Sequence, residues 1–136
     1  MNTKNIQIKD VMTRGVLTVP VESTADYVAA VMVDYGVSAV AVIEKSGEAI
    51  GIISEMDVLR KIDNIDWKKT LADELMAPSI ESINPSSILE EAAQIMSKKH
   101  IHRLMVMSEK SVGASNRPIG IVSAGDVMKQ MLQERN

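Results

Sequence analysis

The spacing of apolar residues changes several times along the chain, between the period of a strand and the period of a helix. In the first half, a short apolar run at 16–19 predicts a strand, and residues 25–35 then carry apolar side chains at helical spacing. The runs 37–43 and 49–53 predict two further strands around a polar turn, and a helical pattern returns over Ser54–Ile62. The first half therefore predicts the order β-α-β-β-α.

The second half repeats this order. Strands are predicted over 80–83, 103–107 and 119–122, and helices over 88–96 and 123–133. The last two strands are separated by Ser108–Pro118, a polar segment with Gly and Pro that is typical of a lengthened hairpin loop. A repeat of this length buries its apolar face against its twin, so we expect the two halves to share one core.

Polar residues mark the starts of several predicted helices. Ser23, Thr70 and Ser87 each stand just before an apolar helical run. In all three cases an acidic residue follows three positions later, which is typical of a capping box. We therefore expect these three side chains to cap the helices that follow them, and we expect Gly36 to end the first long helix because glycine tolerates positive φ.

The two halves also share a short motif. Gly51–Asp57 reads Gly-Ile-Ile-Ser-Glu-Met-Asp, and Gly120–Asp126 reads Gly-Ile-Val-Ser-Ala-Gly-Asp, each across a strand end and a helix start. Two compatible interpretations are open. In the first, the Ser and Asp form a capping box. In the second, the helix start binds a phosphate or a hydroxyl-rich ligand, and the Asp carboxylate accepts hydrogen bonds from both hydroxyls of a ribose. The glycine at the matching position favours binding, because it permits close approach.

Lys98–Arg103 is the dense basic run of the chain. Its lysines suit the C-terminus of a helix, where cations are favourable. His102 and Arg103 stand where a strand begins, and arginine can contact a phosphate through two hydrogen bonds. The first half has Ser38-Ala39 at the aligned positions, so we expect any two anion sites to be unequal.

Composition narrows the classes of function. The 136 residues are 46% hydrophobic and 24% charged, as in a globular domain. A net charge of −3, one Trp, two Tyr and no Phe argue against nucleic-acid binding. The absence of cysteine removes disulfides and thiolate chemistry. Without a signal peptide, an apolar run long enough for a membrane, or a catalytic motif, the sequence predicts a cytoplasmic protein that is not an enzyme.

The openings Val11-Met12 and Leu75-Met76, the two Gly-Ser-Asp motifs and the β-α-β-β-α order resemble the cystathionine-beta-synthase (CBS) domain, here as a tandem pair or Bateman module. The resemblance covers repeats at 8–62 and 71–132, with a linker at 63–70. It implies an α/β fold in which the repeats pack through their sheets with pseudo-two-fold symmetry. It also implies clefts between the repeats that bind adenosine derivatives, and flat homodimers formed through the helices.

The resemblance further implies roles for residues. In each repeat, the motif aspartate would hold the ribose hydroxyls, the motif serine would lie near the ribose or phosphate, and the first strand would meet the adenine. His102-Arg103 resembles the pair with which the gamma subunit of AMP-activated protein kinase contacts AMP phosphates. The predicted nucleotide-binding residues are Thr18, Gly51, Ser54, Asp57, Ser82, His102, Arg103, Gly120, Ser123 and Asp126.

We therefore predict a regulatory module that binds AMP, ADP or ATP as a regulatory ligand, uses no catalytic cofactor or metal, and signals to an effector protein by a change in geometry. One alternative is an assembly scaffold whose sites stay empty and whose capping boxes are purely structural. Another is a module for S-adenosylmethionine or a metal ion, in which the aspartate is used but His102-Arg103 is not.

Overall fold

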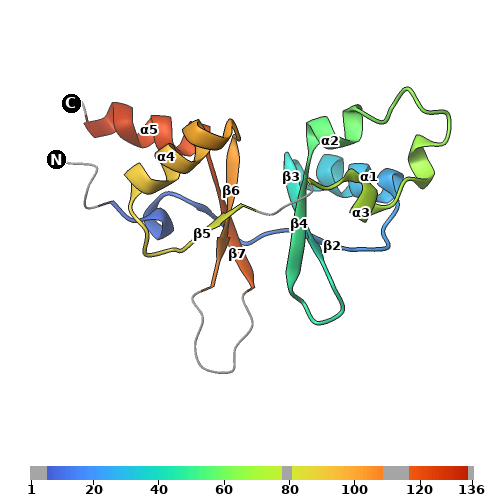
Figure 1. The fold of residues 1–136 in the computed structure, drawn as a ribbon, viewed down its shortest axis with the longest axis horizontal. Helices are drawn as coiled ribbons and strands as arrows, with labels where there is room; N and C mark the ends of the chain where they lie inside the picture. The colour runs from blue at the N-terminus through green and yellow to red at the C-terminus, as the bar shows by residue number, and fades with distance from the viewer. Residues whose placement is uncertain (1–5, 78–80, 109–116, 135–136) are drawn as a thin grey trace. The chain divides into compact units, whose positions relative to one another are not determined.

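The computed structural model describes residues 6–77, 81–108 and 117–134. The chain divides into two compact units, one formed by Leu17–Ile80 and the other by Met1–Val16 together with Glu81–Asn136 (Figure 1). The N-terminal segment therefore packs with the second sequence repeat, and not with the repeat that it precedes. We call the two units the central unit and the terminal unit.

The central unit, Leu17–Ile80, is built on a three-stranded sheet of order β2-β3-β4, in which β2 is parallel to β3 and β3 is antiparallel to β4. Its elements are β2 (Thr18–Pro20), α1 (Ala25–Tyr35), β3 (Ala39–Ile43), β4 (Ala49–Ser54), α2 (Glu55–Leu59), η3 (Trp67–Lys69) and α3 (Ala72–Leu75). The helices lie against one face of the sheet (Figure 1), where Val40 and Ile53 of the strands pack with Val28 of α1 in the core. Helix α2 is shorter than predicted, because the amides of Lys61 and Ile62 donate to the carbonyls three residues back, as in turns, and no longer four residues back.

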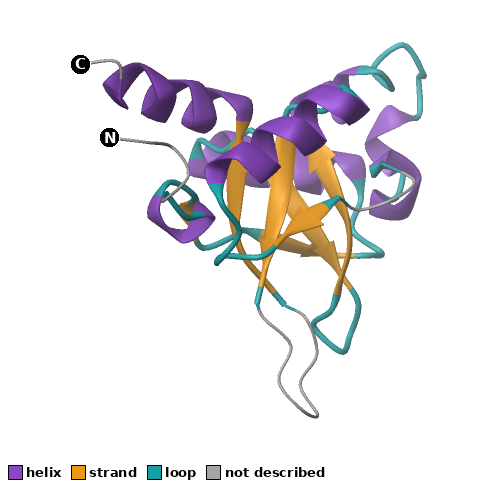
Figure 2. Cartoon of the chain, turned by 60° about the vertical axis from the view of Figure 1, so that its left-hand side comes forward, coloured by secondary structure: helices purple, strands orange, loops and turns teal. Residues whose placement is uncertain are grey.

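The terminal unit is built on a four-stranded sheet of order β1-β7-β6-β5. Its elements are η2 (Ile8–Asp10), β1 (Thr13–Arg14), β5 (Ser82–Ile83), α4 (Leu89–Lys99), β6 (Arg103–Met107), β7 (Pro118–Ser123) and α5 (Ala124–Glu134). Helix α5 begins directly where β7 ends (Figure 2). Ile8 from the N-terminal segment is fully buried in the same core as Leu104 and Val122. Ile80 and most of the predicted loop Ser108–Pro118 lie outside the described residues.

The predicted caps at Ser23, Thr70 and Ser87 are wrong. The N-caps of α1, α3 and α4 each lie one residue after the predicted cap, at Thr24, Leu71 and Ile88, and none of these makes a side-chain capping hydrogen bond. The Thr24 hydroxyl donates to the carboxylate of Asp26 instead, and this hydrogen bond is the main cause that lowers the pKa of Asp26.

Backbone groups from distant segments take the place of these side-chain caps. Thr24 and Leu71 form an isolated antiparallel bridge, in which the amides of Ala25 and Ala72 donate to carbonyls of the opposite segment at 2.7 and 2.8 Å. These are the first residues of α1 and α3, so the two helix starts satisfy one another. An equivalent bridge joins the start of α4 to the N-terminal segment.

Helices α1 and α4 end in the same left-handed conformation but on different residues. Gly36 has φ 64°, as predicted for a glycine, whereas His100 has φ 55° at the end of α4. A residue with a Cβ atom is strained there, so His100→Gly is expected to raise the free energy of unfolding by about 1 kcal/mol. Urea unfolding measures this change. Gly36→Ala is the matched control and should lower stability by a similar amount; a stabilised Gly36→Ala would contradict the explanation.

Candidate functional site

The predicted site residues of the central unit lie on two different faces of its sheet. Thr18 pairs with Ala41 and Ala41 with Ile52, so these three side chains share a face, and Ser54 joins them two residues along β4. This face is opposite to the one that packs against the helices. Gly51 lies on the helix-covered face, because it alternates with Ile52.

The terminal unit has the same arrangement, with more polar side chains. Ser82 pairs with Met105 on β6, and Arg103, two residues before Met105, lies directly opposite Ser123 on β7. Ser82, Arg103 and Ser123 therefore project from the face of the sheet that is opposite to the helices. We call this surface the Arg103 face.

Both predicted Ser-Asp capping boxes are confirmed. In the central unit, the amide of Ser54 donates to Asp57 Oδ2 at 2.7 Å and the amide of Asp57 donates to Ser54 Oγ at 3.4 Å. In the terminal unit, the amide of Ser123 donates to Asp126 Oδ2 at 2.8 Å and the amide of Asp126 donates to Ser123 Oγ at 3.1 Å. Each aspartate is thus held at the start of a helix, at the edge of the sheet face that is opposite to the helices.

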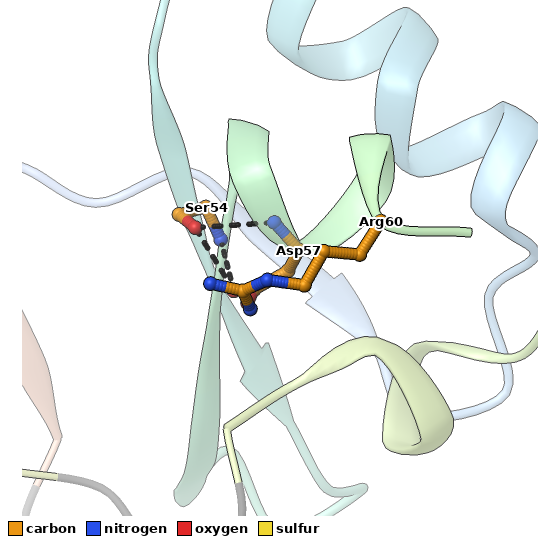
Figure 3. A network of polar contacts seen from close by, with 3 residues as sticks. All are labelled: Ser54, Asp57 and Arg60. Atoms are coloured by element: carbon orange, nitrogen blue, oxygen red, sulfur yellow. Dashed lines mark hydrogen bonds and ion pairs between the residues drawn. The ribbon is translucent and has the colours of Figure 1, made fainter. Parts of the chain in front are cut away.

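The two aspartates differ in their remaining contacts. Asp57 also accepts a hydrogen bond from the Ser54 hydroxyl, and its Oδ1 forms an ion pair with Arg60 at 2.8 Å (Figure 3). Among the residues that the structure describes, none donates to Oδ1 of Asp126. The position aligned with Arg60 holds Lys129, which is exposed. The sequence analysis did not identify Arg60, although its position three residues after Asp57 is a recognisable signal for a helical ion pair.

The two motif glycines are explained by packing. A Cβ atom on Gly51 would overlap the side chain of Met76, and one on Gly120 would lie 2.6 Å from the carbonyl oxygen of Thr13 and 2.9 Å from Met12 Sδ. The space that each glycine leaves is therefore filled by the methionine of an opening segment. The sequence analysis predicted that these glycines permit a ligand to approach the strands closely. In the structure a methionine side chain approaches them, on the face of the sheet that packs in the core.

The basic run divides into two parts. Lys99 at the end of α4 forms an ion pair with Glu81 at 2.9 Å, which agrees with a structural role for the lysines. Arg103 is half-buried at the start of β6. His102 precedes it and is exposed, and its carbonyl oxygen accepts a hydrogen bond from the amide of Ala124 at 2.8 Å. The main chain of His102 is thereby fixed beside the first turn of α5, next to the Ser123 and Asp126 box.

Two other kinds of site were searched over the described ranges. No group of three or more His, Cys, Asp or Glu side chains there could hold a metal ion. None of the helices described is both long and apolar enough to cross a bilayer.

An apolar groove that the sequence analysis missed lies on the helical side of the central unit. Its volume is about 460 Å³, and it is lined by Ala29, Met32, Val33, Gly36, Val37, Ser38, Glu55, Val58 and Leu59. The groove lies between α1 and α2, whose apolar spacing was assigned to the core. Val33 and Leu59 are nevertheless 79% and 52% exposed, so this surface is a candidate for protein contacts.

Comparison with known proteins gives one family. Residues 8–64 and 72–133 match the CBS domain. The chain is 33% identical over 129 residues to the CBS domain-containing protein YhcV of Bacillus subtilis, covering 93% of this chain and 87% of YhcV. Two further relatives, from Methanocaldococcus jannaschii and Methanopyrus kandleri, are longer, and the chain spans 39% and 63% of their lengths.

Solved structures agree with this result. CBSX2 in complex with AMP is 25% identical, with a TM-score of 0.78, and the match covers 96% of this chain and 99% of CBSX2. The CBS domain pair of protein MJ0100, in complex with 5′-methylthioadenosine and S-adenosyl-L-methionine, is 18% identical, with a TM-score of 0.79 and coverage of 96% and 98%.

Proposed function

Because the chain belongs to the CBS-domain family and carries two such repeats, we propose that it is a regulatory module that binds an adenosine-containing ligand on the Arg103 face. AMP, ADP and ATP are the ligands that fit this proposal best, because the face combines a carboxylate for ribose with an arginine for phosphate. The proposal includes no catalytic step, and its output is a change in conformation that an effector protein recognises.

One observation carries this proposal: Asp126 is held by Ser123 through Oδ2, while Oδ1 receives no hydrogen bond from the residues described. In the proposal, Asp126 accepts hydrogen bonds from the two ribose hydroxyls, as an acidic residue does in other nucleotide folds. Ser82 lies on the same face, and β5 would meet the adenine. Arg103 would contact the phosphate, supported by its place directly opposite Ser123.

The proposal extends to a homodimer formed through the helices. Exposed apolar side chains on the helices support it, and they include Val33 and Tyr35 of α1, Leu59 of α2, and Met128, Met131 and Leu132 of α5. Exposed apolar side chains that lie together within a unit commonly mark a protein contact. Such a contact would let a ligand-induced change in one chain reach a second chain or the effector.

Thermal unfolding in the presence of AMP, ADP, ATP, NADH and S-adenosylmethionine tests the proposal. A ligand at 100 times its dissociation constant is expected to add about 2.7 kcal/mol to the free energy of unfolding, enough to raise the Tm by several degrees. Asp126→Ala is expected to abolish this increment. The loss of the capping box lowers stability without ligand by about 0.5–2 kcal/mol, so the ligand-dependent increment is the quantity to compare.

Asp57→Ala is the matched control, because it removes the equivalent box from the central unit. It is expected to retain most of the increment. If no ligand of the panel stabilises the wild type, the scaffold alternative replaces the regulatory proposal. If S-adenosylmethionine is the only compound of the panel that stabilises the wild type, the chain is a module for S-adenosylmethionine, and Arg103 does not bind a phosphate.

A further inference from the structure

The carboxylate of Asp57 is already occupied by its own protein. Its Oδ2 accepts from the amide of Ser54 at 2.7 Å and from the hydroxyl of Ser54 at 3.0 Å, and its Oδ1 accepts from Arg60 Nη1 at 2.8 Å (Figure 3). A carboxylate offers about four acceptor positions in total. Three donors on Asp57 therefore leave too few acceptor positions for the two hydroxyls of a ribose.

The carboxylate of Asp126 in the terminal unit is not occupied in this way. Asp126 accepts one hydrogen bond from the amide of Ser123, and within the described part of the chain neither the Ser123 hydroxyl nor Lys129 donates to its carboxylate. A lysine is a compact point charge on a flexible stem, whereas the guanidinium of Arg60 presents donors in a fixed plane that suits a carboxylate. The exchange of Arg60 for Lys129 thus accompanies the difference between the two aspartates.

We infer that Arg60 is a specificity-determining residue that weakens ligand binding at the Asp57 site, so that the ligand prefers the Arg103 face. This inference rests on the proposed function, because it takes ribose recognition by the aspartate as its premise. To bind at Asp57, a ribose must displace Arg60 from Oδ1. The residues aligned with His102-Arg103 are Ser38-Ala39, which offer no cation for a phosphate. The central unit therefore lacks both the available carboxylate oxygen and the cation that the terminal unit offers.

The expected effect is modest, because the ion pair is partly open to solvent. The side chain of Arg60 is 68% exposed and that of Asp57 is 13% exposed. Pairs of this kind contribute little, so removing Arg60 should tighten binding at Asp57 by about two- to fivefold. Salt screens such a pair. Raising the salt concentration should therefore also tighten the binding of an uncharged ligand at Asp57, but only while Arg60 is present.

The test uses adenosine, which has a ribose but no charge for Arg60 to attract. NMR titration compares Asp126→Ala with the double variant Asp126→Ala/Arg60→Ala, at low and at high salt. The double variant should bind adenosine about two- to fivefold more tightly than Asp126→Ala at low salt, and the difference should shrink at high salt. Lys129→Ala is the matched control in the wild-type chain, and adenosine affinity should not change there.

The outcomes separate this inference from its premise. If the wild type binds adenosine and the double variant binds it no more tightly than Asp126→Ala, the role of Arg60 is overturned while the proposed function stands. If neither the wild type nor any variant binds adenosine or a panel nucleotide, the proposed function fails and the inference fails with it. A tighter double variant whose advantage persists unchanged at high salt overturns the ion-pair explanation.

Discussion

Gly120→Ala is expected to lower the free energy of unfolding by about 2–3 kcal/mol, as insertion of a methyl group into a packed region does. The added Cβ would lie 2.6 Å from the carbonyl oxygen of Thr13 and 2.9 Å from Met12 Sδ. The carbonyl cannot rotate away, because Thr13 belongs to β1, which is paired with β7. Strand β1 must shift as a whole, and urea unfolding at constant slope measures the cost.

Gly51→Ala provides the matched control for Gly120→Ala. The atoms nearest to its Cβ would be Sδ, Cγ and Cβ of the Met76 side chain, and a methionine can move its Sδ and Cγ by changing rotamer. The loss of stability should therefore be smaller, and Met76→Ala should remove part of it in the double variant. Equal losses at the two glycines would contradict this account. If Gly120→Ala has normal stability but binds nucleotide more weakly, Gly120 has the role in ligand binding that the sequence analysis predicted.

Arg103→Ala is expected to weaken AMP binding by about 10- to 100-fold and to leave adenosine binding nearly unchanged. The loss corresponds to one hydrogen bond between charged groups, which contributes about 1.5–3 kcal/mol. Isothermal titration calorimetry with both ligands measures the difference. The comparison is independent of stability changes, because adenosine reports on the ribose and adenine contacts of the same folded variant.

Lys98→Ala is the control for Arg103→Ala, since it removes an exposed cation from the same basic run. It should reduce AMP affinity only slightly, through long-range attraction that salt screens. An equal loss of AMP and adenosine in Arg103→Ala would assign Arg103 a structural role. Unchanged AMP binding would favour the alternative in which the ligand has no phosphate at this position.

The family and the α/β fold are predictable from the sequence, and both are confirmed. Their signals are local. The apolar spacing of 25–35 and the apolar run within 103–107 predict a helix and a strand that the structure contains with the same ends. Ser54 and Ser123 were also predictable as caps, because both partners of each box lie within four residues.

The caps at Ser23, Thr70 and Ser87 could not be assigned from local sequence. The groups that accept hydrogen bonds from the amides at these helix starts are backbone carbonyls of segments far away in the chain. Every residue has a backbone carbonyl, so the type of residue does not reveal which one accepts. His100 was missed as a helix end for a related reason, because the left-handed conformation there is held by a residue that does not favour it.

Part of the candidate site could not be predicted either, because it depends on contacts between segments that are far apart in the chain. The pairing of Arg103 with Ser123 follows from hairpin register and was within reach of the pattern. The filling of the motif glycines by Met12 and Met76 was not, because it depends on which unit each opening segment joins. Nor does residue type alone decide between an ion pair at Arg60 and none at Lys129.

The division of the chain into units also determines when each core can form during synthesis. The central unit is a continuous stretch, Leu17–Ile80, so all of its core residues are synthesised before the second repeat and the unit can fold as the chain emerges. Ile6 and Ile8 precede the central unit in the chain, whereas the strands β6 and β7 that share a core with them follow it. During synthesis these two apolar residues therefore lack the strands that bury them until the whole central unit and part of the second repeat have been made.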